Sequence, residues 1–77
     1  MHKLQSQVQK VLKKNKVELS QEEILLGIYD ELSNITRSTV AKEGVSSESL
    51  GELGTLLLQL CNEEGLDFEK VVKDYLN

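Results

Sequence analysis

The chain of 77 residues contains no proline, one cysteine and one histidine, and these scarcities exclude several kinds of site. Because Cys61 is the only cysteine, no disulfide can form within one chain, and we interpret it as a small buried apolar residue rather than a reactive thiol. Structural zinc takes four nitrogen and sulfur ligands, which Cys61 and the lone His2 cannot supply. Without proline, linkers or low-complexity segments, residues 1–77 are expected to form one domain.

Long apolar runs are also missing. No stretch approaches the ~20 apolar residues that a membrane-spanning helix needs. The opening residues Met1 to Gln5 are too polar for a signal peptide. Together with the single cysteine, which fits a reducing compartment, this predicts a cytoplasmic protein without membrane contact.

Common catalytic and nucleotide-binding motifs are absent. The sequence has no G-x-G-x-x-G, no P-loop, no H-E-x-x-H and no C-x-x-C. The remaining candidates for catalysis or metal binding are therefore the carboxylates, of which there are thirteen.

The net charge is −4, and it is unevenly distributed. Residues 1–17 carry five lysines and no acid, whereas the remainder has four basic residues against thirteen acids, a balance of −9. Nucleic-acid affinity comes mainly from neutralising phosphates, so we do not expect nucleic acid to be a partner of so acidic a chain. The basic start could meet phosphates or an acidic partner, and the acidic part could hold cations. The alternative is that both are solvated helix faces.

Every informative stretch has helical periodicity, which predicts an all-α fold of about four helices. Apolar residues recur at intervals of three and four, as in the series Leu4, Val8, Val11, Leu12 and the series Ile24, Ile28, Leu32, Ile35. The expected ranges are about 3–14, 20–42, 46–64 and 67–76.

Capping residues support these boundaries. Ser20 followed by Glu23 forms a capping box, Ser46 or Ser47 can cap the third helix, and Asp67 can cap the fourth. Gly65 is a suitable residue to end the third helix.

The apolar composition of the third helix predicts that the chain associates with other chains. Leu50, Leu53, Leu57 and Leu60 form one stripe, but further leucines and Cys61 make the helix apolar nearly all round, so it must be covered nearly all round. A chain this short buries only about 60% of its unfolded surface. We therefore expect a helical bundle completed by oligomerisation, as a homodimer or homotetramer, with the amphipathic fourth helix docked on it. Gly51 and Gly54 suggest either close approach of another backbone or simple tolerance.

Carboxylates on two helices could form a metal site. Asp30 and Glu31 lie within three or four residues of Asn34, and Glu48 lies four residues before Glu52, so each group shares a helix face. If the second and third helices pack antiparallel, the two faces can meet, and oxygen ligands of this kind suit Mg²⁺. Ordinary solvent-facing acids would give the same spacing.

Four blocks of the chain resemble the MazG-like nucleoside triphosphate pyrophosphohydrolases and, more distantly, phosphoribosyl-ATP pyrophosphatase. The opening Leu4-Gln5-x-x-Val8-x-x-Val11 is similar to the first helix of that family. Leu26-Gly27-Ile28-Tyr29-Asp30-Glu31-Leu32 is similar to its L-G-L-x-E-E-V. Leu50-Gly51-Glu52 is similar to L-G-D, and Gly65-Leu66-Asp67-Phe68-Glu69-Lys70-Val71 to G-I-D-L-E-E-V. The resemblance runs nearly end to end, with matching order and spacing.

The resemblance implies a metal motif of the form E-E-x-x-E followed by E-x-x-D, whose acids hold Mg²⁺ on a triphosphate. The first block falls on Asp30, Glu31 and Asn34, and the second falls on Ser49 and Glu52. Three of these five positions are acidic, and Asn34 and Ser49 depart from the motif. Glu48 is a candidate to compensate for Ser49.

The predicted function is thus a divergent Mg²⁺-dependent hydrolase that cleaves a nucleoside triphosphate to monophosphate and pyrophosphate. Glu31 and Glu52 are its expected catalytic residues, and Asp30, Glu31, Asn34, Glu48 and Glu52 its expected metal-site residues. Lys10, Lys14 or Arg37 could contact phosphates. Two alternatives stay open: a catalytically inactive relative that acts as a helical oligomeric interaction protein, and an unrelated four-helix adaptor that uses its basic first helix.

Overall fold

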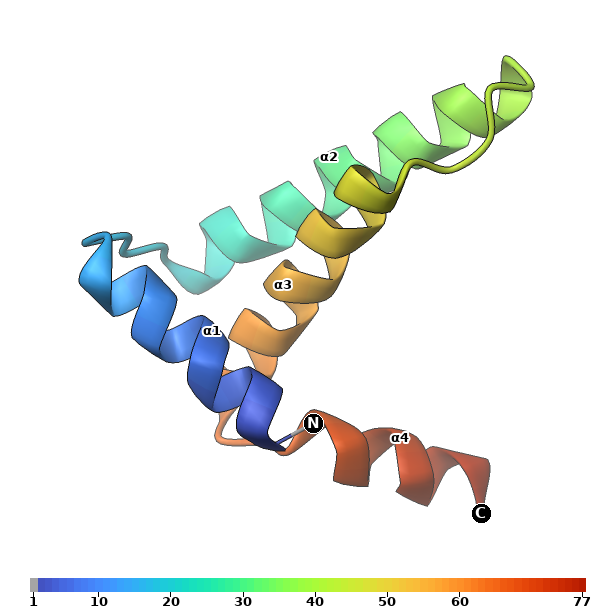
Figure 1. The fold of residues 1–77 in the computed structure, drawn as a ribbon. Coiled ribbons are helices and arrows are strands. Elements are labelled where there is room, and N and C mark those ends of the chain that lie inside the picture. The colour runs from blue at the N-terminus through green and yellow to red at the C-terminus, as the bar shows by residue number, and fades with distance from the viewer. Residues whose placement is uncertain (1) are drawn as a thin grey trace.

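A computed structural model describes residues 2–77, and over this range the chain consists of four helices and no strand (Figure 1). Met1 and the side chain of His2, the one histidine, lie outside the described part. The helices are α1 (His2–Lys14), α2 (Gln21–Val40), α3 (Ser47–Glu64) and α4 (Phe68–Leu76). The predicted all-α class and the number of helices are confirmed.

The predicted caps begin three of these helices. The Ser20 hydroxyl accepts a hydrogen bond from the backbone N–H of Glu23, whose carboxylate accepts one from the Ser20 N–H, so the capping box is complete. Ser46 rather than Ser47 caps α3, and Asp67 caps α4 by accepting from the Lys70 N–H. Each bond satisfies an amide that the first helical turn leaves without a partner.

Three helices end in the same motif. After α1, α2 and α3, a residue in the left-handed region is followed by an N–H that bonds to the carbonyl five residues earlier. Gly65 occupies this position after α3, as predicted, but Lys16 and Lys42 occupy it after α1 and α2, with φ values of 56° and 62°. As a result α2 stops at Val40, two residues before its expected end.

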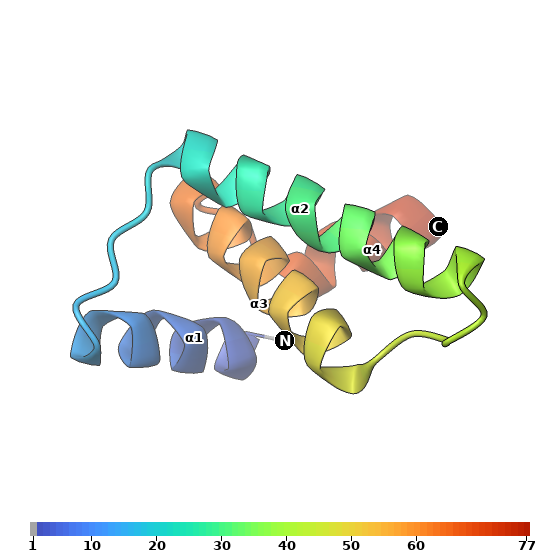
Figure 2. The same cartoon turned by 90° about the horizontal axis from the view of Figure 1, so that it is seen from above.

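The core lies where α3 packs against both α1 and α2 (Figure 2). Ile24 from α2 is fully buried, and Leu58 from α3 and Val8 from α1 are 5% and 9% exposed. Helices α2 and α3 approach closely at Gly27, where an added Cβ would lie 3.2 Å from the side chain of Leu56. The chain therefore has a small core whose main component is the antiparallel α2–α3 pair.

The buried side chain of Gln5 joins the two ends of the chain. Its amide group donates to the Leu66 carbonyl at 2.8 Å and to Asn62 Oδ1 at 3.1 Å, and its oxygen accepts from the Phe68 N–H at 2.6 Å. Asn62 returns a bond to the Gln5 carbonyl. Because these partners lie at the end of α3 and the start of α4, one glutamine fixes the α3–α4 corner onto α1.

Helix α4 differs from the expectation that it docks on the bundle. Beyond its first residues it extends away from α2 and α3, and its contacts are with α1 (Figure 1). Val71 and Val72 are 41% and 39% exposed, and Tyr75 and Leu76 are 88% and 75% exposed. The amphipathic periodicity was correct, but the apolar face has nothing in the same chain to cover it.

The whole chain exposes more surface than its mass predicts. The accessible area is 6151 Å², against about 4700 Å² for a folded monomer of 8.7 kDa. The radius of gyration, 13.5 Å, likewise exceeds the roughly 11.5 Å expected for 77 residues. A single chain thus leaves apolar helix faces in water.

Two further observations bear on the sequence predictions. Gly51 and Gly54 have no atom of another segment within 4 Å of an added Cβ, so within one chain no backbone approaches them. Within residues 2–77, no helix is both long and apolar enough to cross a membrane.

Candidate functional site

The α2–α3 pair brings two of the predicted site residues together. Glu31 faces α3 from the middle of α2, and the carboxyl of Glu52 on α3 lies close enough to raise the pKa of the Glu31 carboxyl. Antiparallel packing causes this meeting: Gly27 of α2 lies against Leu56 of α3, so four residues further along α2 and four residues back along α3 bring Glu31 opposite Glu52. The two expected catalytic residues are therefore neighbours across the helix interface.

The electrostatics of the pair follow from this geometry. The hydrogen bond with Glu52 raises the pKa of Glu31 above its ordinary value of 4.5, and desolvation and the negative charges of Glu52, Asp30 and Glu48 raise it further. A hydrogen bond between two carboxyls requires that one of them carry a proton. The two neighbouring carboxylates repel each other, so the pair favours the binding of a proton or a cation.

The other residues of the predicted motif, and Glu48, are not part of this pair. Asp30 and Glu48 are exposed, and they act on Glu31 through their charges. Asn34 is exposed, and its Oδ1 accepts a hydrogen bond of 2.7 Å from Arg37. The half-buried Ser49 gives its backbone N–H to the cap of α3.

The number of acidic groups close to the Glu31–Glu52 pair limits what it can bind. Among residues 2–77, no three Asp, Glu, His or Cys side chains converge in an arrangement that could hold a metal ion by themselves. Glu31 and Glu52 alone could supply at most part of a Mg²⁺ shell, which in proteins is commonly one or two carboxylates completed by waters and substrate phosphates. The two carboxylates by themselves therefore do not make a complete metal site.

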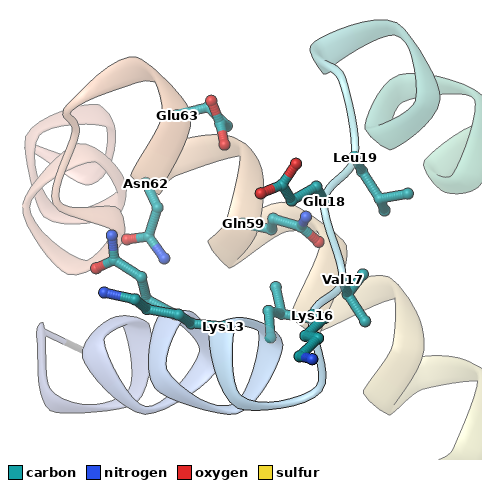
Figure 3. A pocket seen from close by; sticks show the side chains of 10 residues that line it. Lys13, Lys16, Val17, Glu18, Leu19, Gln59, Asn62 and Glu63 are labelled. Atoms are coloured by element: carbon teal, nitrogen blue, oxygen red, sulfur yellow. The ribbon is translucent and has the colours of Figure 1, made fainter.

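A separate cavity lies between the end of α1, the α1–α2 connection and α3 (Figure 3). Its volume is about 940 Å³. The labelled charged side chains around it are Lys13, Lys16, Glu18 and Glu63, so the positive and negative charges balance. None of the five predicted metal-site residues lines it.

Sequence reasoning did not find this cavity. It named Lys10 and Lys14 of α1 as possible phosphate contacts, whereas the cavity is lined by Lys13 and Lys16. The left-handed turn at Lys16 redirects the chain toward α3, and no motif in the sequence indicates that turn.

Cys61 lies half-buried on α3 and has no bonded partner cysteine. Burial raises the pKa of its thiol, and the nearby Asp67 charge raises it further. Because the thiolate is the reactive form, both effects disfavour a nucleophilic role.

No protein-family model, no curated protein and no solved structure matches this chain. The resemblance to the MazG-like pyrophosphohydrolases consequently depends on the residue blocks themselves. What is established is a small all-α protein of four helices.

Proposed function

We propose that this protein is a divergent MazG-like nucleotide pyrophosphohydrolase, which cleaves a nucleoside triphosphate to monophosphate and pyrophosphate with Mg²⁺. The observation that carries the proposal is the meeting of Glu31 and Glu52 across α2 and α3. These two residues come from separate blocks of the motif, 21 positions apart in the sequence, and two like charges that meet repel each other unless a proton or a cation binds between them.

The chemistry follows from the closeness of the two carboxyls. A divalent cation between them would offset their mutual repulsion and take an oxygen ligand from each. Asp30 and Glu48 add negative potential that attracts the cation. When bound, Mg²⁺ would neutralise the phosphates and acidify a coordinated water for attack on phosphorus. The neutral Asn34 and Ser49 leave fewer charges than the family motif has, so the substrate phosphates must complete the coordination.

The test is pyrophosphate release across a panel of ribo- and deoxyribonucleoside triphosphates, with Mg²⁺ or with EDTA. Release should require the metal and should disappear in Glu31→Gln, which keeps the shape but removes the ionisable group. Glu43→Gln is the matched control, because Glu43 is exposed in the α2–α3 connection and should tolerate the same change. Hydrolysis that survives Glu31→Gln would remove the assignment.

The second candidate is an inactive relative that works as a helical oligomeric interaction protein. It is favoured by the neutral residues at positions 34 and 49 and by the exposed apolar faces. Thermal melts separate the two, because a ligand that binds only the native state raises the melting temperature. A rise with nucleotide and Mg²⁺ but no pyrophosphate would favour the inactive relative.

A further inference from the structure

Helix α2 carries a second apolar face that no part of the chain covers. Its members are four exposed residues, here called the α2 seam: Leu25, Tyr29, Leu32 and Thr36. They are spaced by four, three and four residues, which keeps them on one narrow stripe and is the spacing of a two-helix coiled-coil contact. The fully buried Ile24 lies about 100° around the helix axis from Leu25, on a different side of the helix.

The α2 seam is both apolar and hollowed. Leu25 and Leu32 are 49% and 48% exposed, and Tyr29 is 71% exposed. Tyr29, Leu32 and Thr36 also line a shallow recess on this face, together with Ser33 and Arg37. Protruding side chains beside a recess are what knobs-into-holes packing between helices requires.

The accessible surface of the chain is large enough to include an interface with a partner. The chain exposes 6151 Å², about 1400 Å² more than a folded monomer of its mass. A standard stable interface removes roughly 800 Å² from each partner. The surplus is therefore enough for a dimer interface on each chain.

We propose that the α2 seam docks against the same seam of a second copy, with the two α2 helices antiparallel. The midpoint of the seam lies between Tyr29 and Leu32, so this pairing places Leu25 opposite Thr36 and Tyr29 opposite Leu32 of the second copy. Such a contact is closed by a two-fold axis and uses one surface twice.

The charges of α2 select the antiparallel arrangement. The first turn carries Glu22 and Glu23, and the last turn carries Arg37. Antiparallel pairing brings Arg37 of each copy to the acidic first turn of the other and opposes the helix dipoles. Parallel pairing would instead place Arg37 beside Arg37 and acid beside acid. A second copy is thus the partner whose charge pattern fits.

The proposal does not depend on the hydrolase assignment, since Glu31 and Glu52 face α3 and are not members of the seam. Sedimentation equilibrium of the full chain measures the dimer dissociation constant directly. Leu32→Glu should raise that constant by at least about 100-fold, because two apolar contacts at the centre of the interface are lost in each dimer. Leu50→Glu is the matched control, since Leu50 is 55% exposed but lies on α3.

A charge exchange provides the second test and does not alter the apolar contact. Arg37→Glu should weaken the dimer about tenfold or more, and adding Glu22→Arg should restore it, with circular dichroism confirming that each variant is helical. A wild-type chain that stays monomeric up to about 1 mM would overturn the proposal. So would a dimer weakened equally by Leu50→Glu, or an Arg37→Glu variant that Glu22→Arg fails to rescue.

Discussion

Ile24→Ala tests whether the α2–α3 pair is held by the small core described above. Ile24 is the one fully buried large side chain among the described residues, so the substitution removes its contacts and leaves a cavity. Isoleucine-to-alanine changes in cores cost about 2–5 kcal/mol. A chain of 77 residues has roughly 4–12 kcal/mol of stability in total, so the loss is a large fraction of it.

Urea unfolding followed by circular dichroism measures this loss at several protein concentrations. Ile24→Ala should lower the stability by about 3 kcal/mol at every concentration, which corresponds to more than about 10 °C in melting temperature. The neighbouring Leu25→Ala is the control: Leu25 is half exposed, so its cost should appear mainly at concentrations where the chain associates. Equal losses at both positions would refute the reasoning about which face of α2 is the core.

Three other predictions concern single features of the fold. Because the pKa of Glu31 is raised on folding, the stability that this group contributes is lost as pH rises through and above 4.5. In thermal melts the metal-free wild type should therefore lose stability relative to Glu52→Gln between pH 5 and pH 7. Gln5→Ala removes the part-buried hydrogen bonds that the Gln5 side chain makes with Asn62, Leu66 and Phe68, so it should cost about 1–3 kcal/mol in urea unfolding and speed hydrogen exchange throughout α4. Unchanged exchange would contradict the role of the α1 contact. Gly51→Ala and Gly54→Ala should each stabilise α3 by up to about 1 kcal/mol, and destabilisation together with altered association would place a second chain against them.

The sequence predicted the local features of the fold well. Helical periodicity and capping chemistry act over three or four residues, so the capping box at Ser20 and Glu23, the Asp67 cap and the Gly65 end could all be recognised. The left-handed residues Lys16 and Lys42 could not, because lysine has no preference for that conformation.

Features that depend on packing were predicted less well. The predicted apolar stripe of α3 ran through Leu50 and Leu53, but the buried leucine of this helix is Leu58. The sequence could not identify it, because a helix that is apolar on most sides does not specify which side its neighbour covers. The packing role of Gly27 and the bridging role of Gln5 depend on residues at least 29 positions away in the sequence. Within one chain α4 contacts α1 but leaves its apolar face exposed, since amphipathicity indicates a partner surface without saying which chain supplies it.

The candidate site shows the same division. Spacing placed Glu31 and Glu52 on helices that could meet, and the antiparallel α2–α3 pair joins them. Spacing did not predict that Asp30 and Glu48 would be exposed to solvent rather than join the pair.

The central claim is that Glu31 and Glu52 together bind a divalent cation, and paramagnetic Mn²⁺ tests it residue by residue. In a ¹H–¹⁵N spectrum of the full chain, substoichiometric Mn²⁺ should broaden first the amides around Glu31 and Glu52, and Glu31→Gln should abolish that effect. Broadening centred instead on Glu63 and Glu64 at the end of α3, or spread evenly over the acidic surface, would contradict the account.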